Sequence, residues 1–248
     1  MANVALSILA HPDDAEFLCA GTLIRLRREL NWEIHLATMT PGDLGTAEYS
    51  SGEIARIRRG EGRAAAEVIG AQYHCLEEHD LRVIYSESTL AKATLLLRKV
   101  RPSILITHSP KDYMLDHEMT SQIARAAAFA APVPLYLKGD LPPLERIPHL
   151  YYCDAIEGKD PLGQDVPPGF CIDIGSVIET KAEMLAQHAS QRNWLIKHHG
   201  MDNYIESMRQ WSAHRGGEHA VPFAEGFRQH LGHSYPQDNL LGKLLGWV

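Results

Sequence analysis

The chain has 248 residues, of which 45% are hydrophobic and 22% charged, and its formal net charge is −7. This length suits one large α/β domain or two small ones, and it is enough to bury a substantial core. The acidic balance argues against nucleic acid or an anionic membrane as the main partner, because both recruit clustered Lys and Arg. No apolar run approaches the ~18–20 residues needed to cross a bilayer, so we expect no membrane span.

The first residues carry no basic segment and run directly into an apolar strand pattern, which is not the pattern of a signal peptide. The four cysteines lie far apart in the sequence and form no C-x-x-C pair. We expect them to be free and mostly buried thiols. These features predict a cytoplasmic protein.

Strand and helix patterns alternate through the first half of the chain. In chain order they predict a strand at 4–10, a helix at 16–30, a strand at 33–39, a helix at 52–69, a strand at 72–76, a helix at 88–100, a strand at 103–108 and a helix at 117–131. Such alternation is typical of parallel strands joined by crossover helices. We therefore predict an α/β fold with a Rossmann-like, doubly wound, mostly parallel sheet that has helices on both faces.

The pattern weakens in the second half, where prolines cluster between 131 and 166. There we expect loops and one strand at 150–153, followed by a long amphipathic helix at 178–198. The tail from 212 onward is rich in Gly and His and is expected to be irregular. Because no repeat or linker divides the chain, we predict a single domain over 1–248. Its α/β core would be 1–131, and 132–248 would be a more irregular part of the same domain.

The first candidate for chemistry is the segment from Ala10 to Glu16, AHPDDAE, which lies between the first strand and the first helix. In open α/β sheets, ligands bind in the crevice beyond the carboxyl ends of the strands. A His and two adjacent carboxylates there are costly to bury unless a cation or proton uses them. One Asp can ligate a metal beside His11 while the other faces a metal-bound water. The alternative is that Asp14 merely caps the helix at Glu16.

A second candidate follows the strand at 103–108, in the loop from Thr107 to His117. With parallel strands, this loop reaches the same edge of the sheet as His11, and His117 can complete a His, Asp, His set. Three protein ligands and one water are the open arrangement of a catalytic zinc site, in which the pKa of the water falls toward ~7. The free carboxylate can then act as general base and later as general acid.

The stretch 10–21, AHPDDAEFLCAG, closely resembles the opening motif of the LmbE-like, or PIG-L-like, zinc-dependent de-N-acetylase family. Weaker resemblances are TPGDLG at 40–45, RRGE at 58–61, Asp80-Leu81 and the HASQ segment at 188–191. The resemblance implies a set of roles. The zinc ligands would be His11, Asp14 and His117, the general base Asp13, the substrate-binding residues Arg58 and Asp80, and Asp116 would support a ligand.

This resemblance implies a hydrolase that removes an acyl group, in the first place acetyl, from an N-acylated sugar or sugar conjugate. The small-molecule sugar would be the partner, and the cofactor would be one Zn²⁺, with another divalent metal such as Fe²⁺ as the alternative. Relatives often form trimers or hexamers, so a homo-oligomer is expected.

One position departs from the family. Where relatives often have His-Pro-Asp-His, this chain has Met114-Leu115-Asp116-His117. The first His of that motif is associated with oxyanion stabilisation or proton donation, and a thioether does neither. We expect a substitute donor close to the metal, in the order His188, Tyr113, His108.

Two other functions remain open at this point. An iron(II) oxygenase also uses two His and one carboxylate, and Asp13 would then be the ligand. Such enzymes have double-sheet β folds. A non-catalytic metal- or sugar-binding protein is the other alternative, and Met114 motivates it. No G-x-G-x-x-G follows the first strand, which disfavours a nicotinamide dehydrogenase.

Overall fold

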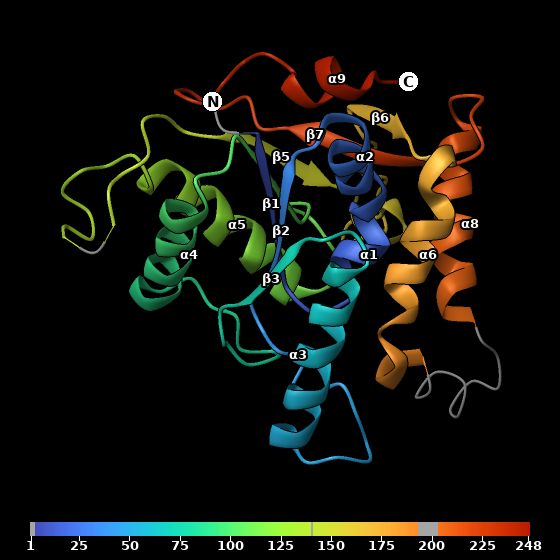
Figure 1. Cartoon of the computed structure of the whole chain (residues 1–248), viewed down its shortest axis with the longest axis horizontal. Helices are drawn as coiled ribbons and strands as arrows, with labels where there is room; N and C mark the ends of the chain where they lie inside the picture. The colour runs from blue at the N-terminus through green and yellow to red at the C-terminus, as the bar shows by residue number, and fades with distance from the viewer. Residues whose placement is uncertain (1–2, 140, 193–202) are drawn as a thin grey trace.

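The computed structural model describes residues 3–139, 141–192 and 203–248. Within these residues the chain folds into helices and strands in the following order (Figure 1): β1 (Val4–Leu9), α1 (Asp14–Leu18), α2 (Ala20–Leu30), β2 (Glu33–Thr38), α3 (Ser51–Glu67), β3 (Gln72–Cys75), α4 (Glu87–Val100), β4 (Ile104–Thr107), α5 (Leu115–Ala130), β5 (His149–Cys153), η1 (Ile156–Gly158), β6 (Phe170–Asp173), η2 (Gly175–Val177), α6 (Ile178–Ala186), α8 (Asn203–Gly217), β7 (Ala224–Gln229) and α9 (Leu240–Leu245).

The described strands form one sheet in the order β3-β2-β1-β4-β5-β7-β6. The first five strands are parallel, and β7 joins β5 and β6 in antiparallel fashion. The central strand β1, VALSIL, is buried at every position. A strand that is apolar along its whole length suits the middle of a parallel sheet, which helices cover on both faces. The predicted fold class is confirmed.

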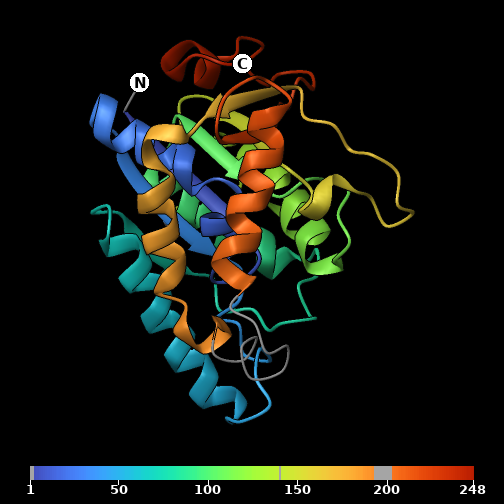
Figure 2. The same cartoon turned by 90° about the vertical axis from the view of Figure 1, so that its right-hand side faces the viewer.

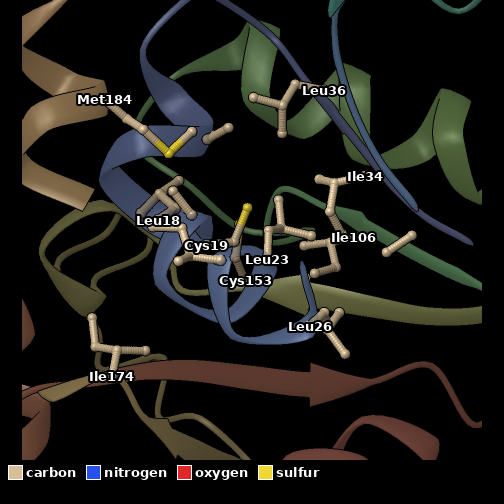
Figure 3. Packing of buried hydrophobic residues seen from close by; sticks show 14 of the residues in the cluster. Leu18, Cys19, Leu23, Leu26, Ile34, Leu36, Ile106, Cys153, Ile174 and Met184 are labelled. Carbon is tan, nitrogen blue, oxygen red and sulfur yellow. The ribbon is translucent and has the colours of Figure 1, made fainter. Parts of the chain in front are cut away.

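Two hydrophobic clusters mark the two faces of the sheet. One cluster joins the sheet to α2, α3, α6 and α8, and the other joins it to α4 and α5. Figure 2 shows α6 and α8 side by side over the first of these faces. Leu23 and Leu26 of α2 pack there against Ile34 and Ile106 of the sheet (Figure 3). The cysteines are free, as predicted, and Cys19 belongs to this cluster.

The first predicted helix, 16–30, is in fact two helices. Helix α1 ends at Leu18, and Cys19 adopts φ −146° and ψ 1°, outside the helical region. The carboxylate of Glu225, on β7, accepts hydrogen bonds from the backbone N–H groups of Gly21 (2.8 Å) and Thr22 (2.7 Å). A residue some 200 positions away therefore fixes the start of α2. The local sequence around α2 cannot predict that contact.

The predicted helix 178–198 and the irregular tail are also wrong in part. Helix α6 ends at Ala186, a break follows at Gln187 and His188, and 193–198 lie outside the described residues. The tail from 212 onward contains the end of α8, β7 and α9. Helix α8 is hard to recognise because its fully covered stripe is narrow and includes a serine, Ser212. Strand β7 contains a glycine and a buried Glu, residues that β-propensity disfavours.

A buried ion pair ties these C-terminal elements to the core. Lys181 of α6 donates to Glu225 over 2.7 Å, and the two side chains are 1% and 2% exposed. The same ammonium lies 3.3 Å from the hydroxyl of Ser212 on α8. The pair therefore joins α2, α6, α8 and β7 at one point.

We expect Lys181→Met to destabilise the fold by about 3–5 kcal/mol, because it leaves the Glu225 carboxylate buried without its cation. The matched control is Lys243→Met, which breaks an exposed pair with Asp238 and should cost less than about 1 kcal/mol. The free energy of unfolding, measured in urea, compares the two variants. Equal values for both would contradict this account of the pair.

Candidate functional site

The crevice between β1 and β4 is where the strand order changes direction, from β3-β2-β1 on one side to β4-β5 on the other. Ligands of open α/β sheets bind at such a switch point, beyond the carboxyl ends of the strands. His11 follows β1 and His108 follows β4, so the two candidate loops meet there. The sequence analysis expected the loops after these two strands to reach the same edge of the sheet, and the observed topology agrees with that expectation.

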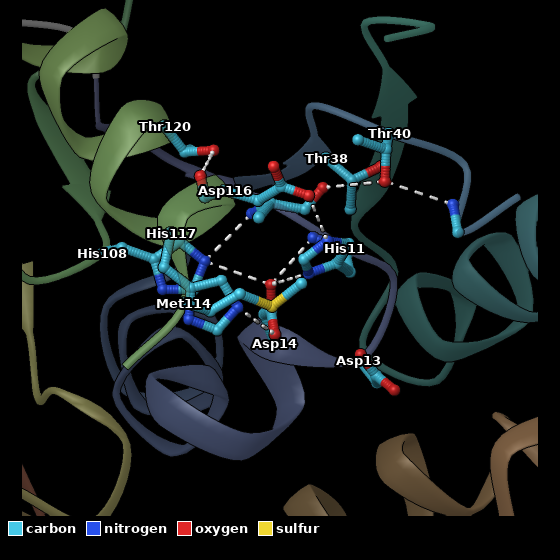
Figure 4. Close-up of polar contacts among 12 residues, drawn as sticks. His11, Asp13, Asp14, Thr38, Thr40, His108, Met114, Asp116, His117 and Thr120 are labelled. Atoms are coloured by element: carbon cyan, nitrogen blue, oxygen red, sulfur yellow. Dashed lines mark hydrogen bonds and ion pairs between the residues drawn. The ribbon is translucent and has the colours of Figure 1, made fainter. Parts of the chain in front are cut away.

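His11, Asp14 and His117 converge in this crevice (Figure 4). The three candidate ligand atoms all lie within 4.8 Å of one another, and all three residues are buried. One oxygen of Asp14 lies 3.4 Å from Nδ1 of His11, and the other lies 3.6 Å from Nε2 of His117. Asp14 does not act as the helix cap, because Asp13 holds that position and Asp14 Oδ2 accepts the N–H of His11 over 2.8 Å.

Each histidine of this set has a carboxylate on its other nitrogen. Nε2 of His11 lies 3.3 Å from Oδ2 of Asp116, and Nδ1 of His117 lies 3.0 Å from Oδ1 of Asp112. Such partners hold the proton on the outer nitrogen and present the inner lone pair to a metal. The inner nitrogens, Nδ1 of His11 and Nε2 of His117, are the two that face Asp14. The donor set thus fits a divalent cation.

Neighbouring charges within the cluster control the pKa values of its side chains. Burial alone would lower the pKa of His11, but the hydrogen bonds to Asp116 and Asp14 outweigh it and raise the pKa to about 10. Burial alone would raise the pKa of Asp14, but the neighbouring charge of His117 holds it well below its usual value. Without a cation the neighbouring carboxylates therefore favour the protonated form of His11, and a bound metal would displace that proton.

A second group, His108, Asp112 and His117, also has ligand atoms within 4.8 Å of one another. The ring of His108 stacks on that of His117, with centroids 3.9 Å apart, and its Nε2 accepts the N–H of Ala10 over 3.0 Å. Burial and the charge of His117 lower the pKa of His108 to about 4. His108 is fully buried and does not line the pocket described below, so a substrate reaches the first group and not this one.

Asp13 lies apart from the cluster. In Figure 4 its carboxylate points away from the His11, Asp14 and His117 side chains. Its Oδ2 accepts a short hydrogen bond from the hydroxyl of Tyr204 and lies 3.3 Å from Nη2 of Arg58. Burial raises the pKa of Asp13, and the Arg58 charge offsets part of that rise. The backbone of Asp13 has φ 100°, a conformation that L-residues rarely adopt and that often marks functional sites.

Arg58 is held against the loop that follows β2. It is 4% exposed and donates from Nη2 to the carbonyl of Pro12 over 2.6 Å. A Cβ at Gly42, whose φ is +74°, or at Gly45 would collide with the guanidinium. Glycine at these two positions therefore makes room for a buried cation beside Asp13.

Asp80 forms hydrogen bonds to the loop that follows β2. Its Oδ1 accepts from the hydroxyl of Thr40 over 2.5 Å, and its Oδ2 accepts from the N–H of Leu44 over 2.9 Å. Because both oxygens are engaged, the side chain orders the loop, although Asp80 also lines the pocket.

A pocket of about 440 Å³ opens over the cluster. This volume lies within the range of small-molecule sites. The predicted site residues that line it are His11, Asp13, Asp14, Arg58, Asp80, Tyr113 and His117. Met114 and Tyr204 line it too. The structure therefore brings together every predicted site residue except His188.

The candidates for the missing donor differ in position. His188 is fully buried behind the pocket wall, with Nε2 3.5 Å from Oε1 of Glu16. Tyr113 is on the pocket wall, with its ring edge-on to His117 at a centroid distance of 5.6 Å. Burial raises the pKa of the Tyr113 hydroxyl to about 12, which keeps it a hydrogen-bond donor. Position therefore favours Tyr113 over His188 and His108.

Sequence reasoning missed two residues of the site. The sequence offered a signal for Asp112, since it lies five residues before His117 in a loop already singled out. No sequence signal pointed to Tyr204, because it lies 191 positions from its partner Asp13 in a segment without a recognisable motif.

The cluster of His11, Asp14 and His117 opens into a pocket on a doubly wound sheet. These features define the class of protein, an α/β enzyme of the de-N-acetylase fold. Residues 6–128 match the family described as PIG-L: GlcNAc-PI de-N-acetylase. The chain belongs to the PIG-L family through this domain, which carries all three members of the cluster.

The relatives of this chain include two kinds of enzyme. A 4-oxalmesaconate hydratase of Pseudomonas putida is 27% identical over 197 residues, which are 76% of this chain and 74% of the hydratase. The crystal structure of GalB, the 4-carboxy-2-hydroxymuconate hydratase of the same species, matches with a TM-score of 0.77 and 23% identity, covering 97% of this chain and 100% of GalB. The N,N'-diacetylchitobiose deacetylase of Pyrococcus horikoshii matches with a TM-score of 0.78 and 24% identity, covering 96% and 89%.

These structural likenesses show a shared fold. They exclude the double-sheet β architecture that the iron(II) oxygenase alternative requires. Among the described residues, no helix is both long enough and apolar enough to cross a membrane.

We expect the protein, freed of metal by a chelator, to take up one divalent ion per chain. Asp14→Asn should weaken zinc binding more than Asp112→Asn, which should cost about 10–100-fold as the loss of a carboxylate that only orients a ligand. Asp165→Asn, an exposed change in a distant loop, is the control. Calorimetric titration with zinc measures all three. Loss of binding in Asp112→Asn alone would place the ion in the His108 group instead.

Proposed function

We propose that the protein is a metal-dependent amide hydrolase that removes an acyl group, in the first place acetyl, from an N-acylated sugar or sugar conjugate. One observation carries the proposal. The His11, Asp14 and His117 side chains converge on one point that opens into a pocket, and a separate carboxylate, Asp13, stands on the wall of that pocket. Family membership supports the same reaction, since the family is described by a de-N-acetylase.

Two imidazole nitrogens and one carboxylate oxygen suit zinc, and iron(II) is the alternative for the same donors. When bound, such an ion supplies a Lewis acid and lowers the pKa of a water molecule. His11, Asp14 and His117 would hold it, while Asp116 and Asp112 keep the two imidazoles oriented.

Asp13 is the proposed general base and acid. Tyr204 and Arg58 both engage its Oδ2, which leaves Oδ1 to accept a proton from water and return it to the departing amine. The raised pKa of Asp13 suits a group that must hold a proton for part of the cycle. Tyr113 is the proposed donor to the developing oxyanion, in the place that Met114 cannot fill.

The substrate is proposed to be a small molecule, because the pocket volume of about 440 Å³ accommodates a sugar and its acyl group. Polar side chains on its wall, among them Arg58 and Asp80, suit a polyhydroxylated ring. We also propose that 1–248 form one domain, because β7 and α9 from the second half complete the sheet and the core. A homo-oligomer remains part of the proposal.

A hydratase is the second candidate. A curated relative is a hydratase, and Met114 removes the histidine that deacetylation is expected to use. The guanidinium of Arg58 beside the pocket would suit a carboxylate of an unsaturated acid. Both reactions need an activated water, and they differ in whether a C–N bond breaks or a C=C bond is saturated.

A single pair of assays separates the two. The zinc-loaded protein is incubated with a panel of N-acetylated sugars, with amine release as the readout, and with unsaturated dicarboxylic acids, with loss of conjugated ultraviolet absorbance as the readout. Amine release supports the hydrolase. Loss of absorbance alone supports the hydratase, and activity in neither assay supports a non-catalytic binding protein.

We expect Asp13→Asn to keep its zinc but to lose about 10²–10⁴-fold in kcat, the usual contribution of a general base. Tyr204→Phe, which removes only a hydrogen bond to Asp13, should lose less. Asp165→Asn again serves as the control. Zinc content and amine release are measured on the same preparations. If Asp13→Asn loses the metal while Asp14→Ala retains it, the roles of the two carboxylates are reversed.

A further inference from the structure

A second pocket, of about 450 Å³, lies beside the candidate site between α1, η1 and α8. We call it the Trp211 groove; its walls include Phe17, Leu18, Ile156, Glu157, Trp211 and His214. Apolar side chains form much of this wall, and Leu18 at its base is only 3% exposed.

The groove adjoins the candidate site. Phe17 and Ile156 line both pockets. One side of each residue therefore faces the candidate site, and the other faces the groove. The ring of Phe17 also contacts that of Tyr204, at a centroid distance of 5.4 Å, and Tyr204 is bonded to Asp13. A ligand seated over the cluster can therefore extend past Phe17 into the groove.

Trp211 is fixed as a platform in this groove. The guanidinium carbon of Arg215 lies 4.7 Å from the centroid of its ring, and Asp154 and Glu218 bind that guanidinium at 2.8 and 2.9 Å. At Gly158, with φ +61°, a Cβ would come within 3.0 Å of the indole. A glycine and a clamped arginine thus hold the indole in one position.

The charges around the groove disfavour an anionic ligand. Glu157 contributes a carboxylate to the wall, and Glu218 lies 3.6 Å from His214. The charge of Arg215 is already matched by two carboxylates. An uncharged apolar group gains from burial here without competing with these pairs.

We propose that the Trp211 groove binds an uncharged apolar group of the substrate, an aromatic ring or a short alkyl chain, that projects from the sugar away from its acyl group. This proposal rests on the proposed hydrolase function and narrows its substrate class to sugar conjugates with an apolar aglycone. Trp211 and Phe17 are then determinants of specificity, and the aromatic contact supplies binding energy that a bare sugar lacks.

The kinetic test compares the phenyl and methyl β-glycosides of N-acetylglucosamine. We expect kcat/KM to be roughly 10–50-fold higher for the phenyl glycoside, the size of effect that burial of one such group supports. In Trp211→Ala this ratio should fall to within about threefold of one. Ser207→Phe, which fills the groove from an exposed position of α8, should lower the ratio as well and guards against misfolding of the first variant. Trp247→Ala, at an exposed tryptophan near the C-terminus, should leave the ratio unchanged.

A binding test separates this proposal from the proposed reaction. Phenyl β-D-glucoside has no acyl group to release, and calorimetry measures its binding without turnover. Binding that Trp211→Ala abolishes, with no amine released from any substrate, would support the groove and overturn the hydrolase. Amine release with equal kcat/KM for the phenyl and methyl glycosides would overturn the groove and keep the hydrolase. A stronger preference for a phosphorylated or disaccharide aglycone would likewise overturn the groove.

Discussion

The site depends on one buried carboxylate, Asp14, held between two imidazoles at the switch point of the sheet. An ionised carboxylate in such a place is costly unless a cation matches it. Without a metal the neighbouring imidazoles are the groups that can match its charge, and the hydrogen bonds to Asp116 and Asp14 raise the pKa of His11 to about 10. The arrangement of Asp116 and Asp112 behind the rings leaves the inner nitrogens directed at the same point. A divalent metal resolves this concentration of charge more completely than protons do, because it serves all three ligands at once.

Much of this centre could be predicted from the sequence, for a physical reason. Parallel strands place their carboxyl ends at one edge, so residues following β1 and β4 must meet whatever their separation in the chain. His11, His117 and one of the two adjacent aspartates could therefore be grouped without coordinates, and the choice of Asp14 came from the family resemblance. The alternation of strand and helix patterns predicted the parallel strands of the sheet, and β1 and β4 among them are buried at every position.

What could not be predicted depends on contacts without a local pattern. Glu225 interrupts the first helix from the far end of the chain, and Tyr204 reaches Asp13 from α8. The antiparallel strands β6 and β7 escape recognition because β7 contains a glycine against which the Asp154 carboxylate lies. For Glu225 and Tyr204, a polar group from one segment satisfies a polar group of another, and hydrophobic periodicity carries no record of such pairs.

The two halves of the molecule therefore contribute different things to function. The first half supplies the cluster of His11, Asp14 and His117, and hydratases and deacetylases among the relatives share its fold. The second half supplies Tyr204, which orients the carboxylate outside the cluster, and Trp211, which forms the wall beyond it. Since α8 carries both residues, a change in its position would alter the hydrogen bond to Asp13 and the Trp211 groove together. Divergence of reaction and substrate within this fold is then expected to concentrate on α8 and the η1 turn, while the loops after β1 and β4 keep the arrangement of His11, Asp14 and His117.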